Sequence, residues 1–163
     1  MLRKSLKLHA LLHSADLIEQ HLRIELEPLG LRPRQARLLD ALDHAGTSSQ
    51  VDLARAFDVS PASMSTMTQR LVQGGYVLRT VDPDERRTNT LELTEKGRAL
   101  LSDVRKAWRN VDRIIENAIG AENAGQLASL AFGLRDALGG RPPAKALKAG
   151  KPHKADVDNR RRT

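Results

Sequence analysis

The amino-acid sequence predicts a mainly α-helical fold that carries a small two-stranded β-hairpin. Apolar residues recur at spacings of three and four through most of the chain, the period of a helix with one buried face. Only residues 76–81 and 88–93 have the composition of strands, and a polar, turn-forming loop separates them. The 163 residues suit one domain, and an aromatic content of 2% predicts a core of Leu, Val, Ile and Ala.

Two helices are expected first, over about residues 4–28 and 34–44. Pro28 and Gly30 end the first helix, and Gly46 ends the second. The apolar stripe of the first helix consists of Leu8, Leu11, Ala15, Ile18 and Leu22.

Two shorter helices should follow, because Ser49 and Ser60 are each placed to cap a helix with the side-chain oxygen. Asp52 follows Ser49 in the manner of a capping box, and Pro61 occupies a first helical position, where a missing N–H costs nothing. A glycine pair at positions 74 and 75 ends the second of them. Because a tight turn joins these helices, they form a helix-turn-helix arrangement.

Two long helices complete the predicted elements. Thr94 caps the first and Gly120 breaks it. The apolar residues of these helices are Leu101, Val104, Trp108, Val111, Ile115 and Ala118, then Leu127, Leu130, Ala131, Leu134 and Leu138. Such stripes either pack within one chain or cover a second copy, and Trp108 fits a core or an interface.

The positive charge is concentrated at the C-terminal end. Residues 139–163 carry eight Lys or Arg against two Asp, which is +6 of the net +7 of the chain. This segment has almost no large apolar residue, so we expect a disordered basic tail. Because the remaining chain is nearly neutral, any nucleic-acid site in it must be a local patch.

Several classes of protein are disfavoured by the composition. The chain has no cysteine, which excludes disulfides and thiol catalysis, and no apolar run approaches the ~18 residues of a membrane span. No nucleophile–base motif, glycine-rich phosphate loop or paired set of metal ligands is present. We therefore expect a cytoplasmic protein that is not an enzyme and has no cofactor, metal centre or membrane partner.

The second helix of the helix-turn-helix pair has two chemically different faces. Met64, Met67 and Leu71 lie on the side that can pack. The other side and its flanks carry hydrogen-bonding residues without a carboxylate: Ser63, Ser65, Thr66, Gln69, Arg70 and Gln73. Arg and Gln pair with guanine and adenine, and Ser and Thr contact phosphate, so these residues are candidates for DNA binding. The alternative is an ordinary amphipathic helix with a solvated face.

The hairpin strengthens the DNA-binding interpretation. Arg86 and Arg87 lie at its expected tip, and guanidinium groups at the tip of such a wing can enter the minor groove. Asp84 and Glu85 precede them, and one of these carboxylates could orient an arginine. An acid–base surface turn is the alternative.

The run from Leu53 to Leu101 resembles the MarR family of transcriptional regulators. The pattern D-P-D-E-R-R-x-x-x-L-x-L-T-x-x-G, which starts at Asp82, is similar to the wing of that family, and the resemblance covers about residues 5–138. It implies a winged helix-turn-helix module at 31–94 and a dimerisation region at 1–30 and 95–138. It also implies that Arg87 enters the minor groove and Glu85 supports it in place of the usual Asp, while Arg79 touches phosphate.

The function implied by the resemblance is a repressor that binds a palindromic operator in double-stranded DNA as a homodimer. A small aromatic acid or phenol would release it, and His13 and Arg37 are candidate ligand contacts. Two alternatives remain: a winged-helix module that binds proteins, or a metal-responsive regulator. The second alternative draws on His9 and His13, which have i, i+4 spacing but no acidic or cysteine partner set.

Overall fold

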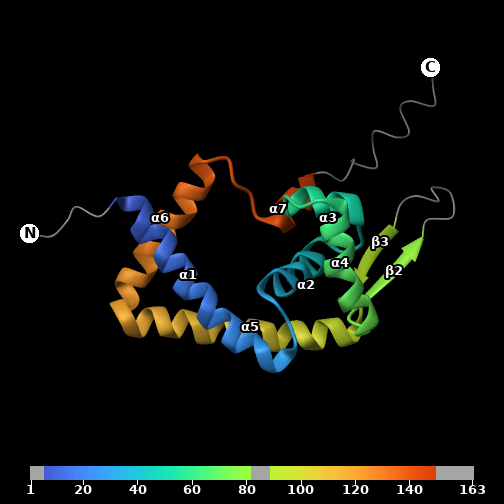
Figure 1. Cartoon of the computed structure of the whole chain (residues 1–163), viewed down its shortest axis with the longest axis horizontal. Helices are drawn as coiled ribbons and strands as arrows, with labels where there is room; N and C mark the ends of the chain where they lie inside the picture. Colours follow the sequence, from blue (N-terminus) through green and yellow to red (C-terminus); the bar gives the residue numbers. More distant parts are fainter. Residues whose placement is uncertain (1–5, 82–88, 150–163) are drawn as a thin grey trace, which may run out of the picture.

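The computed structural model describes residues 6–81 and 89–149 (Figure 1). The helices are α1 (Lys7–Leu26), α2 (Pro33–Ala45), α3 (Gln50–Ala56), α4 (Pro61–Gln73), α5 (Glu95–Ile119), α6 (Ala121–Ala137) and α7 (Pro143–Ala149), with a 3₁₀ turn η1 (Glu27–Leu29). The strands are β1 (Ser48–Ser49), β2 (Val77–Val81) and β3 (Asn89–Leu93). In Figure 1, α2, α3, α4 and the strands gather at one end, and α5 runs from the strands towards α6 at the other.

The three predicted N-caps are confirmed. The Ser49 side chain accepts a hydrogen bond from the Asp52 backbone N–H at 3.0 Å, and Ser60 accepts one from the Ser63 N–H at 3.1 Å. Thr94 Oγ1 accepts from the Gly97 N–H, also at 3.0 Å. Each cap satisfies an N–H that has no partner within its helix, so each fixes where a helix begins.

The sheet has three strands, in the order β1-β3-β2, and not the two that were predicted. The predicted pair is present, with Val77 opposite Leu93 and Arg79 opposite Leu91 in an antiparallel register. The added strand β1 is only two residues long and pairs Ser48 with Leu91. A two-residue strand has no periodicity to detect, which is why the sequence did not indicate it.

The core lies where the α2–α4 module meets the end of α1 and the first half of α5. Its large side chains with less than 2% exposure are Leu26, Leu38, Leu39, Leu42, Leu53, Met64, Leu71, Leu91, Leu101 and Val104, with Thr68 among them. This composition confirms an aliphatic core. Trp108 is half-buried and packs against it.

Most of the apolar stripe of α1, and all of that of α6, is left exposed by residues 6–81 and 89–149. No residue of α6 is buried, and Leu26 at the end of α1 is the only buried residue of that helix. The exposed fractions are large on both helices: Leu8 59%, Leu11 51%, Leu12 56%, Leu130 73% and Phe132 58%, with 78% for Leu138 at the C-cap of α6. The stripe of α5 is different, because Leu101, Val104 and Val111 are buried within the chain.

The prediction of disorder from residue 139 is wrong for the beginning of that segment. Residues 143–149 form α7, which lies against α2 and α3, and Leu147 is only 4% exposed within the core cluster (Figure 1). Leu147 is the one large apolar side chain of α7, and this helix packs against the surface formed by α2 and α3. Composition could not reveal this, since the receiving surface is made by distant residues. Residues 150–163 lie outside the described part of the chain.

None of the described helices is long and apolar enough to cross a membrane.

The burial of Leu147 predicts a measurable contribution of α7 to stability. Leu147→Ala should lower the free energy of unfolding by about 2 kcal/mol, because it removes a buried side chain and leaves a cavity. Lys145→Ala, at an exposed position of the same helix, should change it by less than about 0.5 kcal/mol. Urea unfolding followed by circular dichroism measures both, and equal midpoints would show that α7 is not docked.

Candidate nucleic-acid interface

The α3–turn–α4 unit is built around a short, sharply bent connection. Asp58 has a φ of +51°, a left-handed conformation that Asp tolerates better than most residues. Its neighbour Val59 donates a backbone hydrogen bond to the Ala54 carbonyl at 3.0 Å, which closes the end of α3. The chain then enters α4 at Pro61. The helix-turn-helix arrangement expected from the sequence is therefore present.

Helix α4 has one buried and one exposed face. Met64 and Thr68 are fully buried and Leu71 is 1% exposed, so these three positions face the core. The exposed positions are Ser63, Thr66, Gln69, Arg70 and Gln73, while Ser65 is half-buried. Five of the six polar residues singled out on this helix are thus open to solvent, and no carboxylate lies on α4. The burial of the polar Thr68 was not anticipated.

The hairpin residues divide into those that the structure describes and those that it does not. Glu85, Arg86 and Arg87 lie outside the described residues. Arg79 lies in β2, and its Nη2 donates a hydrogen bond to Thr68 Oγ1 on α4 at 3.0 Å. The side chain expected to touch phosphate is therefore engaged inside the module.

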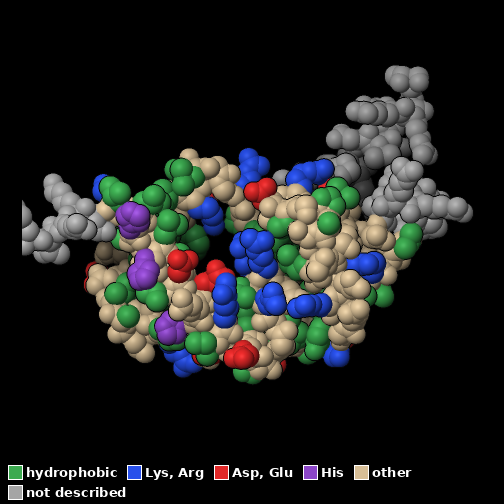
Figure 2. Space-filling view, in the orientation of Figure 1, with side chains coloured by type: hydrophobic (Ala, Val, Ile, Leu, Met, Phe, Trp, Pro, Cys, Tyr) green, Lys and Arg blue, Asp and Glu red, His purple; other side chains and the backbone are tan. Residues whose placement is uncertain are grey.

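A cavity of about 1250 Å³ lies between α1, the start of α2, and α4. The charged residues that line it are Glu19, Arg23, Glu27, Arg32, Arg34 and Arg70, and Ser63 and Thr66 also belong to its wall. Arg23 pairs with Glu19 at 2.6 Å, whereas the other three arginines form no ion pair among the described residues. The wall therefore favours an anion. Figure 2 shows Lys and Arg side chains grouped across the middle of one face of the molecule.

The two candidate ligand residues do not line this cavity. Arg37 is exposed on α2, with its guanidinium 5.9 Å from the centre of the Phe57 ring. His13 is exposed on α1, as is His9. Over residues 6–81 and 89–149, no three or more side chains of His, Asp and Glu gather in an arrangement that could hold a metal ion.

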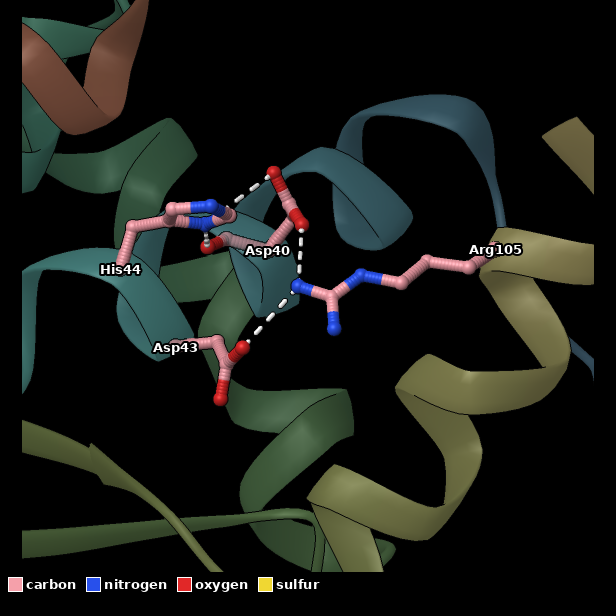
Figure 3. Close-up of polar contacts among 4 residues, drawn as sticks. All are labelled: Asp40, Asp43, His44 and Arg105. Atoms are coloured by element: carbon pink, nitrogen blue, oxygen red, sulfur yellow. Dashed lines mark hydrogen bonds and ion pairs between the residues drawn. The ribbon is translucent and has the colours of Figure 1, made fainter.

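A polar clamp joins the winged module to α5 (Figure 3). Arg105 Nη2 on α5 donates to Asp40 Oδ1 at 2.9 Å and to Asp43 Oδ2 at 3.0 Å, both on α2. The hydrogen bonds to Asp40 and Asp43 raise the pKa of Arg105 above its ordinary value. His44 Nδ1 lies 2.8 Å from the Asp40 carbonyl oxygen at the edge of the clamp. Residues more than 60 positions apart in sequence are thus held together.

The geometry defines a winged helix-turn-helix protein: α3 and α4 form the helix-turn-helix, and β2 and β3 form the stem of the wing. A model of the MarR family matches residues 29–88. The chain is 30% identical over 105 residues to the HTH-type transcriptional regulator MhqR of Bacillus subtilis, an alignment that covers 64% of this chain and 72% of MhqR. It is 34% identical over 97 residues to the transcriptional repressor NicR of Pseudomonas putida, which covers 60% of each chain.

Solved structures agree with this assignment. Apo MarR of E. coli superposes with a TM-score of 0.71 at 22% identity, covering 81% of this chain and 98% of MarR. The transcriptional repressor CouR, bound to a 23-mer DNA duplex, superposes with a TM-score of 0.73 at 25% identity, covering 82% and 98%. The chain belongs to the MarR family of winged helix-turn-helix transcriptional regulators. This is a family of DNA-binding regulators and not of enzymes.

The Arg105 clamp predicts that this single residue supports the joint between α2 and α5. Arg105→Ala should lower the free energy of unfolding by about 1 kcal/mol, because the pairs are partly solvent-screened and two carboxylates are left side by side. Lys106→Ala removes an exposed pair within α5 and should cost about 0.3 kcal/mol. Urea denaturation at low and high salt measures the difference. Equal losses for the two variants would contradict a joint-specific role.

Proposed function

We propose that this protein represses transcription by binding a palindromic operator as a homodimer, and that a small anionic ligand releases it. The observation that supports this most strongly is the exposed face of α4, which presents Gln69 and Arg70 with small hydroxyl side chains and no acid. This face fits a DNA major groove because its side chains can donate to base edges while a carboxylate would be repelled by phosphate. Family relatives include a MarR crystallised with operator DNA.

The exposed stripes of α1 and α6 support the homodimer. Exposed apolar surface of this extent costs free energy in water, and a second copy of the same stripes removes it through a two-fold interface. Residues 1–30 and 95–138 then form the dimerisation region, and residues 31–94 form the DNA-binding module. A two-fold axis would set the two α4 helices on half-sites about one helical turn apart.

The wing and the C-terminal segment supply the remaining proposed contacts. Arg86 and Arg87 would enter the minor groove beside each half-site, with Glu85 orienting Arg87. The positive charge beyond α7 would add affinity for any sequence, because each phosphate contact releases counterions. Sequence preference thus comes from α4, and residues 150–163 affect only the general attraction to DNA.

The arginine-lined cavity supports release by a small aromatic acid. Arg32, Arg34 and Arg70 offer guanidinium groups without carboxylate partners among the described residues. Arg70 and two hydroxyl residues of α4 line the cavity and also face outward. A carboxylate bound there and a DNA duplex would draw on the same side chains, so binding of one would weaken binding of the other.

Selection from a pool of random duplexes tests this proposal. The full chain should enrich a palindrome whose half-sites are about 10 base pairs apart, and a pool without any enriched palindrome would refute the proposal. A chain that ends after Ala149 should keep the preference and lose only general affinity. If the truncation abolished all DNA binding, the module would instead be one that binds proteins.

The exposed face of α4 predicts a base-specific role for Arg70. Arg70→Ala should weaken binding to the selected duplex by about 1–3 kcal/mol and relax the preference at one base pair of each half-site. Lys106→Ala removes the same charge from α5, away from this face, and should bind within twofold of wild type. Fluorescence anisotropy on the selected duplex and its single substitutions distinguishes the two. A uniform loss over all duplexes would mean that Arg70 contacts only phosphate.

The uncovered stripe of α6 predicts that one charge disrupts the dimer. Leu130→Glu should shift the protein towards monomer, because Leu130 is 73% exposed in the single chain and would be desolvated by a partner. Val51→Glu places the same charge on α3, where the side chain is 53% exposed, and should leave the dimer intact. Light scattering after gel filtration gives both masses. A dimeric Leu130→Glu protein would place the interface elsewhere.

A further inference from the structure

The Arg79 side chain leaves β2 on the face of the strand that packs against the core. Successive side chains of a strand alternate between its two faces, so Arg79 shares a face with Val77, which is 2% exposed. Its partner across the ladder is Leu91, which is fully buried. The outward face is represented by Leu78, which is 55% exposed. Arg79 itself is half-buried, and an acceptor inside the module offsets the desolvation of the part that lies there.

Thr68 on α4 is that acceptor, and its other hydrogen bonds show that its hydroxyl accepts from Arg79 and does not donate to it. Its Oγ1 lies 2.9 Å from the Met64 carbonyl oxygen and 3.0 Å from that of Ser65, so its single proton is directed to the helix backbone. A lone pair remains for the Arg79 N–H, 3.0 Å away. Because a guanidinium has no acceptor, the bond can run only from Arg79 to Thr68.

The Arg79 side chain makes a single hydrogen bond within residues 6–81 and 89–149. Arg79 Nε is buried without a partner, and Thr68 is the only hydrogen-bond partner of the side chain among the described residues. Loss of the Thr68 hydroxyl would therefore remove the acceptor that holds this half-buried guanidinium. The bond joins the middle of α4 to the strand that leads into the wing, so it fixes the position of one DNA-facing element relative to the other.

We propose that Arg79 is a positioning residue that aligns α4 with the wing through Thr68, and that it is not a phosphate contact. This inference rests on the proposed function, because it assigns the alignment to DNA binding. The two roles differ in what happens when Thr68 loses its hydroxyl. A phosphate-binding Arg79 would be released to bind DNA, whereas a positioning Arg79 would lose its anchor.

The test measures the affinity of the full chain for the selected duplex at several salt concentrations. Thr68→Val keeps the shape and removes the acceptor, and we expect it and Arg79→Ala each to weaken binding by about tenfold. The double variant should be within twofold of either single one, since both remove the same bond. Thr68→Ser keeps the hydroxyl and should restore binding to within twofold of wild type. Met64→Leu repacks the same face and should leave the affinity unchanged.

The salt dependence identifies the opposite outcome. A phosphate contact adds about 0.9 to the slope of log affinity against log salt. If Arg79→Ala lowered the slope by about that amount while Thr68→Val bound like wild type, the inference would be overturned and the proposed function would stand. If wild type selected no duplex, both would fall. Thermal unfolding checks that each variant is folded. Arg79→Met replaces Arg79→Ala, and Thr68→Ala replaces Thr68→Val, if either of those variants is not folded.

Discussion

The constraint on which the DNA-binding module depends is the burial of one face of α4. Met64, Thr68 and Leu71 are in the core, and a helix with that face buried has no freedom in which side chains it presents to solvent. Gln69 and Arg70 must then point outward. The same packing holds the hairpin, because Leu91 and Leu93 of β3 belong to the same cluster. The buried face of α4 and the face proposed to read DNA thus both follow from the spacing of residues along one helix.

Much of this arrangement could be predicted from local sequence. Ser49, Ser60 and Thr94 cap their helices as expected, because capping depends on residues only three positions apart. Glycine after α4 and α5 marked where each helix ends. The two-faced character of α4 followed from spacing alone. The contacts of Arg86, Arg87 and Glu85 remain predictions, since those residues lie outside the described chain.

The features that sequence did not indicate are those made by distant residues. Strand β1 has two residues and exists only because β3 is there to pair with it. In the sequence, Leu147 is an isolated apolar residue in a basic segment. Its burial depends on the surface formed by α2 and α3, against which α7 packs. Thr68 and Arg79 are 11 positions apart, and Arg105 reaches Asp40 across 65. The spacing of residues along one element carries no information about such pairs. The family resemblance alone therefore predicts that Arg79 contacts phosphate.

The structure also shows how the winged module is joined to α5 and α6, which belong to the proposed dimerisation region. The Arg105 clamp holds α2 to α5, and α7 returns the chain from α6 to α2 and α3. The arginine-lined cavity lies between α1 and α4, so a ligand bound in it would contact both helices. A ligand that changed the distance between α1 and α4 would change the spacing of the two α4 helices in the proposed dimer. That spacing must match the distance between the two half-sites of a palindrome.

Hydroxyl-radical footprinting of the selected duplex tests the central claim most directly. A homodimer that reads DNA with α4 should protect two backbone patches, related by a two-fold axis and about one helical turn apart. The patches should persist when the chain ends after Ala149. A single asymmetric patch, or protection spread evenly along the duplex, would contradict symmetric recognition by two copies of α4.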